Sequence, residues 1–461
     1  MNPPASKEKR FDWPLCYGAE NFIVGQLNSF LARNAFARRL AERMADETGT
    51  LLIDWVDHLT VPRAALSELQ AAGYVDDPLG ETAGGLRALW HPEALLPRVL
   101  VDAGLDVAAS PLQLAVRCES IDDFIRAHGL SQRSEGLPLS RFRRVFVAGE
   151  DDSRLEAVER RGYRGYVPAP AGEPPPGVAE AMEFWRRRPR EFEDAGEGFR
   201  QAHELLDTLV DKIGQDLACH VVFAVERDYW ESRNSAARIQ KNRQNRLGLG
   251  WANHDHHTFR SSRAHFVDLM RALERLGFER RERYYAGAQA GWGAQILEQP
   301  IEGIVAFCDV DLEPGETEID FSRHPLPPGQ RLGTIGLWVG LHGESFLDAG
   351  MHHLECRFDY QLLRDQLESA GVHTMKPFSD FDFLKQAFTD GERWPVRRQR
   401  LERLKSQGLI NDEQFERFLR DGAIGSHLEN LQRKGGFKGF NQRSVSVIIQ
   451  ATDPRIQKTA H

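Results

Sequence analysis

The sequence lacks the features of an exported or membrane protein. No run of roughly 18 apolar residues occurs, which predicts that no segment spans a membrane. The first ten residues, Met1 to Arg10, are polar and contain no apolar core of the kind found in signal peptides. We therefore expect a cytoplasmic protein.

Cysteine is scarce, and its pattern excludes two common kinds of site. The five cysteines are odd in number and widely spaced, at Cys16, Cys118, Cys219, Cys308 and Cys356. No Cys-x-x-Cys pair occurs, so neither a zinc knuckle nor a redox dithiol is expected. This usage fits a reducing compartment.

An excess of positive charge is also absent. The formal net charge is -9, which argues against a broad phosphate-binding surface and hence against a nucleic-acid partner. The balance of 41% hydrophobic and 28% charged residues is that of a globular protein, and 461 residues suffice for two or three domains. The sequence leaves the oligomeric state open.

Residues 1–167 are predicted to form a mixed α/β domain of unknown role. Strand-like segments occur at 51–56, 112–118 and 144–148, and a short helix is expected at 121–128. Asp54, Asp57 and His58 lie close in sequence, and we interpret them as a satisfied polar cluster rather than a catalytic one. Residues 168–198 are rich in proline and glycine and predict a linker with one short helix.

The remainder, residues 199–461, is predicted to be the metal-binding catalytic domain. Residues 199–249 are predicted to be mainly helical, with an interruption at the apolar stretch Val221 to Ala224. Residues 250–312 then read as a strand, an amphipathic helix ended by Gly277, and three strands. A strand and a glycine-ended helix recur from Met351 onward, about a hundred residues later.

This recurrence predicts the fold class. We expect an α+β protein with two paired βαβββ modules, at 250–312 and 350–455, beside the separate N-terminal domain. Residues 393–422 are charged and helical, and they predict a helical hairpin inserted into the second module, either a lid over a site or a plain surface insertion.

The candidate chemistry lies on the first strand of each module. Because residues two apart on a strand share a face, His256 and Arg260 project together, as do His353, Glu355 and Arg357. Two facing modules would bring both histidines to one centre, where a carboxylate would complete a two-histidine, one-carboxylate metal site. A histidine four residues before an arginine is a weak motif alone, and its recurrence carries the prediction.

These segments resemble the vicinal oxygen chelate superfamily, and within it the iron(II) 2-oxoadipate dioxygenase/decarboxylase (hydroxyglutarate synthase) group. Residues 255–260 resemble that group's first ligand segment and residues 353–357 its second, although Glu355 stands where the group has threonine. Residues 383–386 and 429–433 resemble its Phe-Leu-Arg-Gln and Glu-x-x-Gln-Arg stretches. The resemblance covers about residues 250–435.

The resemblance implies an iron(II) dioxygenase with His256, His353 and Glu429 as metal ligands. Its substrates would be dioxygen and a small 2-oxo acid or related carboxylate, which would be decarboxylated and hydroxylated. Arg260 would hold the substrate carboxylate as the catalytic arginine, and Arg357 would assist in binding.

Several alternatives stay open at the level of sequence. Glu355, Asp309 and Gln450 are further candidates for the third ligand. A glyoxalase-like lyase or isomerase using zinc or nickel could be built on the same modules, with Glu355 as general base. Paired modules of this fold also make metal-free proteins that bind small molecules.

Overall fold

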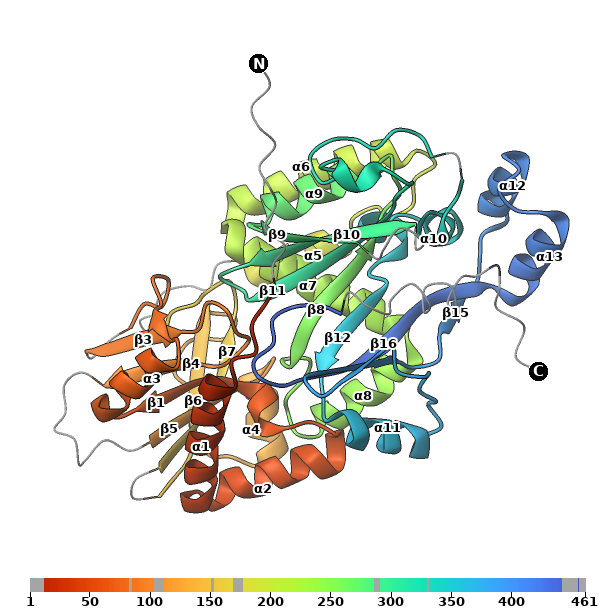
Figure 1. The fold of residues 1–461 in the computed structure, drawn as a ribbon. Helices are drawn as coiled ribbons and strands as arrows, with labels where there is room; N and C mark the ends of the chain where they lie inside the picture. The colour runs from red at the N-terminus through yellow and green to blue at the C-terminus, as the bar shows by residue number, and fades with distance from the viewer. Residues whose placement is uncertain are drawn as a thin grey trace.

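The computed structural model describes residues 12–82, 85–102, 112–150, 153–168, 177–285, 291–329, 331–441 and 455. Two mixed β-sheets, one from each half of the chain, form its frame, and helices pack against both (Figure 1). The protein is α+β, as predicted. In the part of the chain that the structure describes, no helix has the length and apolar character needed to cross a membrane. Gln450 lies outside the described residues.

The C-terminal sheet has nine strands in the order β13-β14-β16-β12-β8-β11-β10-β9, with β15 beside β16. Their bounds are β8 (His254–Arg260), β9 (Glu279–Tyr285), β10 (Trp292–Gln299), β11 (Ile304–Asp311), β12 (His353–Arg357), β13 (Ser379–Phe381), β14 (Leu384–Phe388), β15 (Glu392–Trp394) and β16 (Ala423–Arg433). In each half of this sheet the first strand lies parallel to the last, β8 with β11 and β12 with β16. The two units join through their first strands, because β8 pairs with β12 in antiparallel fashion. The predicted pair of βαβββ modules is confirmed.

The N-terminal sheet repeats this topology. Its seven strands follow the order β2-β3-β4-β1-β5-β7-β6. They are β1 (Val56–Val61), β2 (Val75–Asp76), β3 (Leu86–Trp90), β4 (Arg98–Asp102), β5 (Leu112–Arg117), β6 (Phe142–Glu150) and β7 (Ser153–Arg160). Here β1 is parallel to β4, β5 is parallel to β7, and β1 and β5 pair antiparallel at the centre. The N-terminal domain is therefore a second module pair, with one strand fewer in its second unit.

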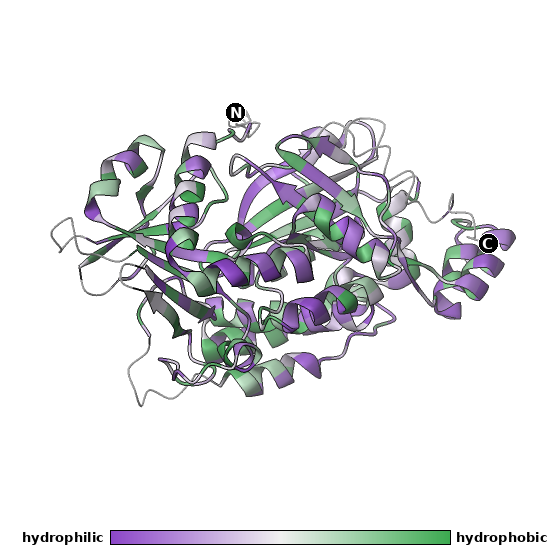
Figure 2. Ribbon diagram, turned by 90° about the horizontal axis from the view of Figure 1, so that it is seen from below, coloured by the Kyte–Doolittle hydropathy of each residue, from purple (hydrophilic) through white to green (hydrophobic). Residues whose placement is uncertain are grey.

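Helices enclose both sheets with their apolar faces inward. Hydrophobic and hydrophilic residues occupy different sides of many of them (Figure 2). Their bounds are α1 (Tyr17–Arg33), α2 (Ala35–Arg43), α3 (Leu66–Ala71), α4 (Ile121–His128), α5 (Val178–Arg186), α6 (Ala195–Ile213), α7 (Gln215–Ser232), α8 (Ser235–Asn245), α9 (Phe266–Arg275), α10 (Thr334–His342), α11 (Tyr360–Ser369), α12 (Arg398–Ser406) and α13 (Asp412–Asp421). Short 3₁₀ segments cover Leu52–Trp55, Arg63–Ala65 and Glu316–Glu318, and π-helical turns cover Met44–Thr48 and Ser345–Ala349.

The segment predicted as a linker is folded into the core where the structure describes it. Trp185 on α5 is fully buried and donates to Glu226 on α7. The Glu226 carboxylate also pairs with Arg188 and Arg190, from the arginine-rich end of the segment. Residues 177–198 thus pack on the helical layer through Trp185, Arg188 and Arg190, and the linker as a domain boundary stays a prediction. The domain boundaries at 167 and 199 stay predictions.

The predicted helical insertion is a hairpin of α12 and α13 that projects from the body of the protein (Figure 1). Asn411 caps α13 in a capping box with Gln414. A small apolar cluster, which includes Leu401 and Phe418, joins the hairpin to Leu337 and Leu341 on α10.

Candidate metal centre

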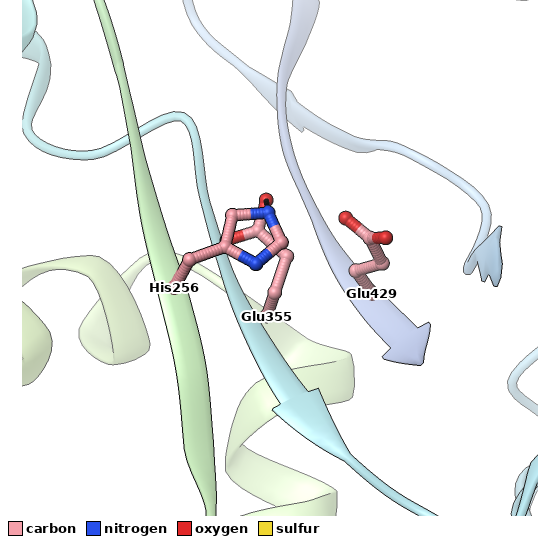
Figure 3. Close-up of side chains that lie close together, drawn as sticks. All are labelled: His256, Glu355 and Glu429. Atoms are coloured by element: carbon pink, nitrogen blue, oxygen red, sulfur yellow. Dashed lines mark ion pairs between the residues drawn. The ribbon is translucent and has the colours of Figure 1, made fainter. Parts of the chain in front are cut away.

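Three acidic or imidazole side chains form a row across the middle of the C-terminal sheet. Strand pairing sets Glu355 of β12 directly opposite His256 of β8 on one side and Glu429 of β16 on the other. Each offers one potential ligand atom, and these atoms all lie within 4.8 Å of one another (Figure 3). All three side chains are buried, with Glu355 at 0% exposure.

A β-bulge orients His256. The pairing of β8 with β12 skips from His256 to His254, which leaves Asp255 as the extra residue. Asp255 contacts His256 Nδ1 at 2.9 Å through Oδ1, and Arg433 donates to both Asp255 oxygens at 2.9 Å. Although burial acts against ionisation, Arg433 and His256 hold the pKa of Asp255 well below its usual range. With Nδ1 engaged, Nε2 faces the row, in the way that a carboxylate partner orients a metal-binding histidine.

The two glutamate side chains are difficult to ionise in this site. Burial and the neighbouring Glu429 raise the pKa of Glu355 well above its ordinary value, and burial raises the pKa of Glu429 to about 8. Glu355 Oε1 accepts from Thr258 at 2.7 Å, and Glu429 Oε1 accepts from Gln386 at 2.8 Å. Glu355 Oε2 is buried without any hydrogen-bond partner.

This donor set fits a divalent cation. Two facing carboxylates in a buried site must share a proton or bind a positive charge. One imidazole nitrogen and two carboxylates suit iron, manganese or zinc. The partnerless oxygen of Glu355 is the kind of atom that a metal ion would satisfy.

His353 lies beside the row. Its Nε2 is 2.7 Å from Glu355 Oε1, and its Nδ1 is buried without a partner. The compact group is therefore His256, Glu355 and Glu429, with His353 next to Glu355, whereas the sequence favoured His256, His353 and Glu429. The structure thus brings all the main predicted ligands together with Glu355, and which of them bind metal stays a prediction.

Arg260 lies in the same pocket, as predicted from its spacing to His256. Its Nε is 3.5 Å from Asp309 Oδ2, and its guanidinium stands 5.5 Å from the ring centre of Trp338. Burial raises the pKa of Asp309 to about 7, although Arg260 acts in the opposite direction. Asp309, an alternative ligand from the sequence, therefore faces Arg260 and is not part of the compact group.

Arg357 is not among the residues that line this pocket, and its role in substrate binding stays a prediction. It is the last residue of β12, where the strand alternation ends, and its Nη2 donates to the carbonyl oxygen of Asp54 at 3.3 Å. Its side chain lines a different cavity between the two halves of the protein.

The pocket above the row is small and mainly aromatic. Its volume is about 80 Å³. Aromatic side chains from both modules form much of its wall: Tyr284, Trp292, Phe307, Phe378, Phe388 and Phe440. Besides the polar residues named above, His352, His427 and Asn441 also line it. A small molecule with a polar end would fit it.

The N-terminal sheet contains a matching row without the ligands. Asp57 contacts His58 Nδ1 at 2.7 Å and is held at both oxygens by Arg160, at 2.7 and 2.8 Å. This is the arrangement of Asp255, His256 and Arg433, and here too the bulge falls between Val56 and His58. The predicted satisfied polar cluster is confirmed for two of its three residues, Asp57 and His58, whereas Asp54 does not share these contacts.

Strand pairing identifies what is missing from this second row. Ala115 stands opposite His58, where the C-terminal sheet has Glu355, and Gln113 stands opposite Thr60, where it has His353. Glu156 corresponds to Glu429, and its carboxylate is already paired with Arg154 at 2.8 Å. Among the described residues, the only group suited to a metal ion is the C-terminal one. The shared Asp-His-x-Thr sequence at 57–60 and 255–258 is the signal that would have revealed this duplication.

Comparison with known proteins adds structural neighbours only. No protein-family model and no curated protein matches the chain. A mutant of 4-hydroxymandelate synthase from Streptomyces coelicolor is similar in structure, with 14% identity and a TM-score of 0.30 over 88% of this chain and 99% of that one. Methylmalonyl-CoA epimerase from Mycobacterium tuberculosis has 14% identity and a TM-score of 0.23 over 39% and 87% of the two chains. A glyoxalase I mutant from Zea mays has 9% identity and a TM-score of 0.18 over 59% and 72%. These values are too low to carry an argument about activity.

Replacing Glu429 with glutamine should stabilise the metal-free protein. The raised pKa means that the folded state resists ionisation above the ordinary glutamate pKa, so the cost grows as the pH rises from about 4 toward 8. We expect Glu429→Gln to raise the free energy of unfolding at pH 7 by on the order of 2 kcal/mol, and by less at pH 5. Urea unfolding at both pH values measures this. Glu156→Gln is the control, because Arg154 already pairs with that carboxylate, and an equal gain there would contradict the explanation.

The two aspartate–arginine pairs allow a matched test of the role of Asp255. Asp255→Asn and Asp57→Asn each remove a buried ion pair, so each should lower stability, by roughly 3–5 kcal/mol. Only Asp255→Asn should also weaken metal binding, by about 10–100-fold, because it alone orients a histidine of the row. Metal titration followed by calorimetry separates the effects. Equal metal affinity in the two variants would show that Asp255 has no such role.

Proposed function

We propose that the protein is a metal-dependent dioxygenase that uses iron(II) and acts on a small 2-oxo acid or a related carboxylate. The observation that carries the proposal is the buried row of His256, Glu355 and Glu429 in one small pocket with Arg260. A site that only bound a metal for stability would have no need of an arginine facing an adjoining aromatic space.

The metal would be held by His256 and Glu429, with Glu355, His353 or both completing the set. Asp255 keeps the His256 tautomer that presents Nε2, while Thr258 and Gln386 fix one oxygen of each glutamate. Iron(II), when bound there, supplies Lewis acidity and redox capacity for a reaction with dioxygen.

Arg260 is suited to hold the carboxylate of the substrate. Its 3.5 Å contact with Asp309 is too long for a good hydrogen bond, and its buried Nε has no hydrogen-bond partner. A substrate carboxylate could therefore take a charge-assisted contact that the protein itself leaves unmade. The aromatic wall would exclude water around it.

The overall reaction balances without an external reductant. The bond between the carboxylate and keto carbons of the 2-oxo acid breaks, and carbon dioxide leaves. One oxygen atom of dioxygen enters the new carboxylate, and the other becomes a hydroxyl group on the same molecule. The 2-oxo acid supplies the electrons.

A glyoxalase-like lyase or isomerase is the second candidate. Glu355 favours it, because its buried Oε2, which has no hydrogen-bond partner among the described residues, could accept a proton from a carbon acid when the carboxylate is ionised. Zinc or nickel would serve that reaction, whereas iron and oxygen consumption mark the first.

Metal content of the purified protein, paired with oxygen uptake on a panel of 2-oxo acids, tests the proposal. We expect about one iron per chain and oxygen uptake with at least one acid, both lost in His256→Ala. His58→Ala, at the matching position of the N-terminal sheet, should keep its metal. Loss of metal in Glu355→Gln but not in His353→Ala would assign the third ligand to Glu355, and the reverse would assign it to His353. Bound zinc or nickel without oxygen uptake would favour the lyase, and no metal after reconstitution would refute both enzymes.

Replacing Arg260 should impair substrate binding more than metal binding. Arg260→Lys keeps the charge but loses the two-pronged contact, so we expect kcat/KM to fall by about 10–100-fold, mainly through KM. Arg323→Ala, at an exposed arginine of the same half, is the control. An unchanged KM in Arg260→Lys and Arg260→Ala would remove Arg260 from the binding site.

A further inference from the structure

A second cavity lies between the two halves of the protein. Its volume is about 190 Å³. Equivalent residues of the two sheets line it: Arg117 at the end of β5 matches Arg357 at the end of β12, and Asp57 matches Asp255. The cavity therefore lies where the duplicated halves face each other, and none of its lining residues belongs to the aromatic pocket.

Most carboxylates in the wall of this cavity are already neutralised. Asp57 is held by Arg160 and Asp255 by Arg433, as described above. Glu298 pairs with Lys438 at 3.0 Å. These carboxylates are therefore not available to neutralise the arginines that line the cavity.

Several arginines of the wall, in contrast, have little to bind. Within the described residues, the Arg117 side chain makes no hydrogen bond and no ion pair. Its strongest electrostatic attraction is to Glu302, whose carboxylate is held by His220 and the Gly162 amide. Among the residues that the structure describes, the Arg357 side chain donates only to the Asp54 carbonyl oxygen, and its Nε has no partner.

The neighbouring groups add to this positive character. Arg98 and Arg164 share a single carboxylate, that of Asp77. The Nδ1 atom of His254 is buried without a partner. The Asp54 carboxylate is the one opposing charge, and burial raises its pKa to about 6 even though Arg357 acts to lower it. Arg117 and Arg357 are partly buried, and guanidinium groups with so few partners in a cavity wall favour the binding of an anion.

We propose that this cavity binds a small anion through a carboxylate or phosphate group held between Arg117 and Arg357. The planar guanidinium group of arginine matches both groups, and two of them, one from each half of the protein, would bind one small dianion. The site is separate from the aromatic pocket, so the proposal does not depend on the proposed dioxygenase activity. It gives the N-terminal half, which lacks the metal ligands, a binding role at its border with the catalytic half.

Calorimetric titration of the full-length protein with inorganic phosphate and, separately, with glutarate tests this site. The titrations are made in an Arg260→Ala background, so that binding in the aromatic pocket does not contribute. We expect one equivalent of at least one probe to bind, with an affinity lowered at least tenfold by Arg117→Ala and partly retained by Arg117→Lys. Binding of phosphate alone identifies a phosphate-bearing ligand, and binding of glutarate alone a carboxylate.

Arg87→Ala is the matched control, because Arg87 is an exposed arginine of the same sheet, paired with Asp76 outside the cavity. It should leave the affinity unchanged. The bound probe should also raise the Tm of the parent protein but not that of Arg117→Ala, and the Tm without probe shows whether each variant is folded. Equal affinity in Arg117→Ala and Arg87→Ala, or no binding of either probe to the parent protein, would overturn the proposal.

Discussion

The buried meeting of Glu355 and Glu429 is the constraint on which the rest of the candidate site depends. Strand pairing forces these two carboxyl groups side by side in the middle of a sheet, where no solvent can screen them. Such a pair is unfavourable for the apo fold, and proteins keep unfavourable arrangements mainly where function needs them. Thr258 and Gln386 donate to these carboxylates, and His256 and His353 lie beside Glu355. Arg433 favours the charged form of Glu429, but its guanidinium is already held by Asp255.

The N-terminal half has the same strand arrangement without the pair of facing carboxyl groups. Its bulged aspartate, oriented histidine and bidentate arginine are all present, at Asp57, His58 and Arg160. Alanine takes the place of Glu355, and an arginine neutralises the remaining glutamate, Glu156. The aspartate–arginine pair is therefore a property of the module pair, whereas the uncompensated carboxylates belong to the C-terminal half. The comparison of the two halves therefore distinguishes residues that belong to the fold, such as the aspartate–arginine pair, from residues that belong to the candidate site, such as the facing carboxylates.

Sequence periodicity predicted the elements that have one wet and one dry face. The strand at 254–260, the helix after it and the helical hairpin at 398–421 all follow such patterns. It failed where burial is complete: the apolar stretch Val221 to Ala224, predicted to interrupt the helices, is the middle of α7, which is buried on most sides and so shows little periodicity. The strand predicted at 51–56 begins only at Val56, because Leu52–Trp55 turns as a 3₁₀ helix.

Alternation along β8 and β12 identified the face that carries His256, His353 and Glu355, but which residue stands opposite His256 is set by the register between strands. That register places Glu355 in the row and leaves His353 beside it, and Arg357, at the end of β12, is not among the residues that line the pocket.

Arg357 lies at the border between the two halves of the protein. Arg357 lines the same cavity as its counterpart Arg117, at the border between the sheets. Duplication explains this, because a side chain at the end of the central strand pair is placed in the same way in both halves, and the two halves face each other there. The candidate metal ligands occur in one half only, whereas both halves have the arginine at this position. The border between the sheets therefore has arginines that an anion would neutralise, whereas the row has carboxylates that a cation would neutralise. Both features involve β12, because Glu355 lies in the row and Arg357 lines the cavity at the border.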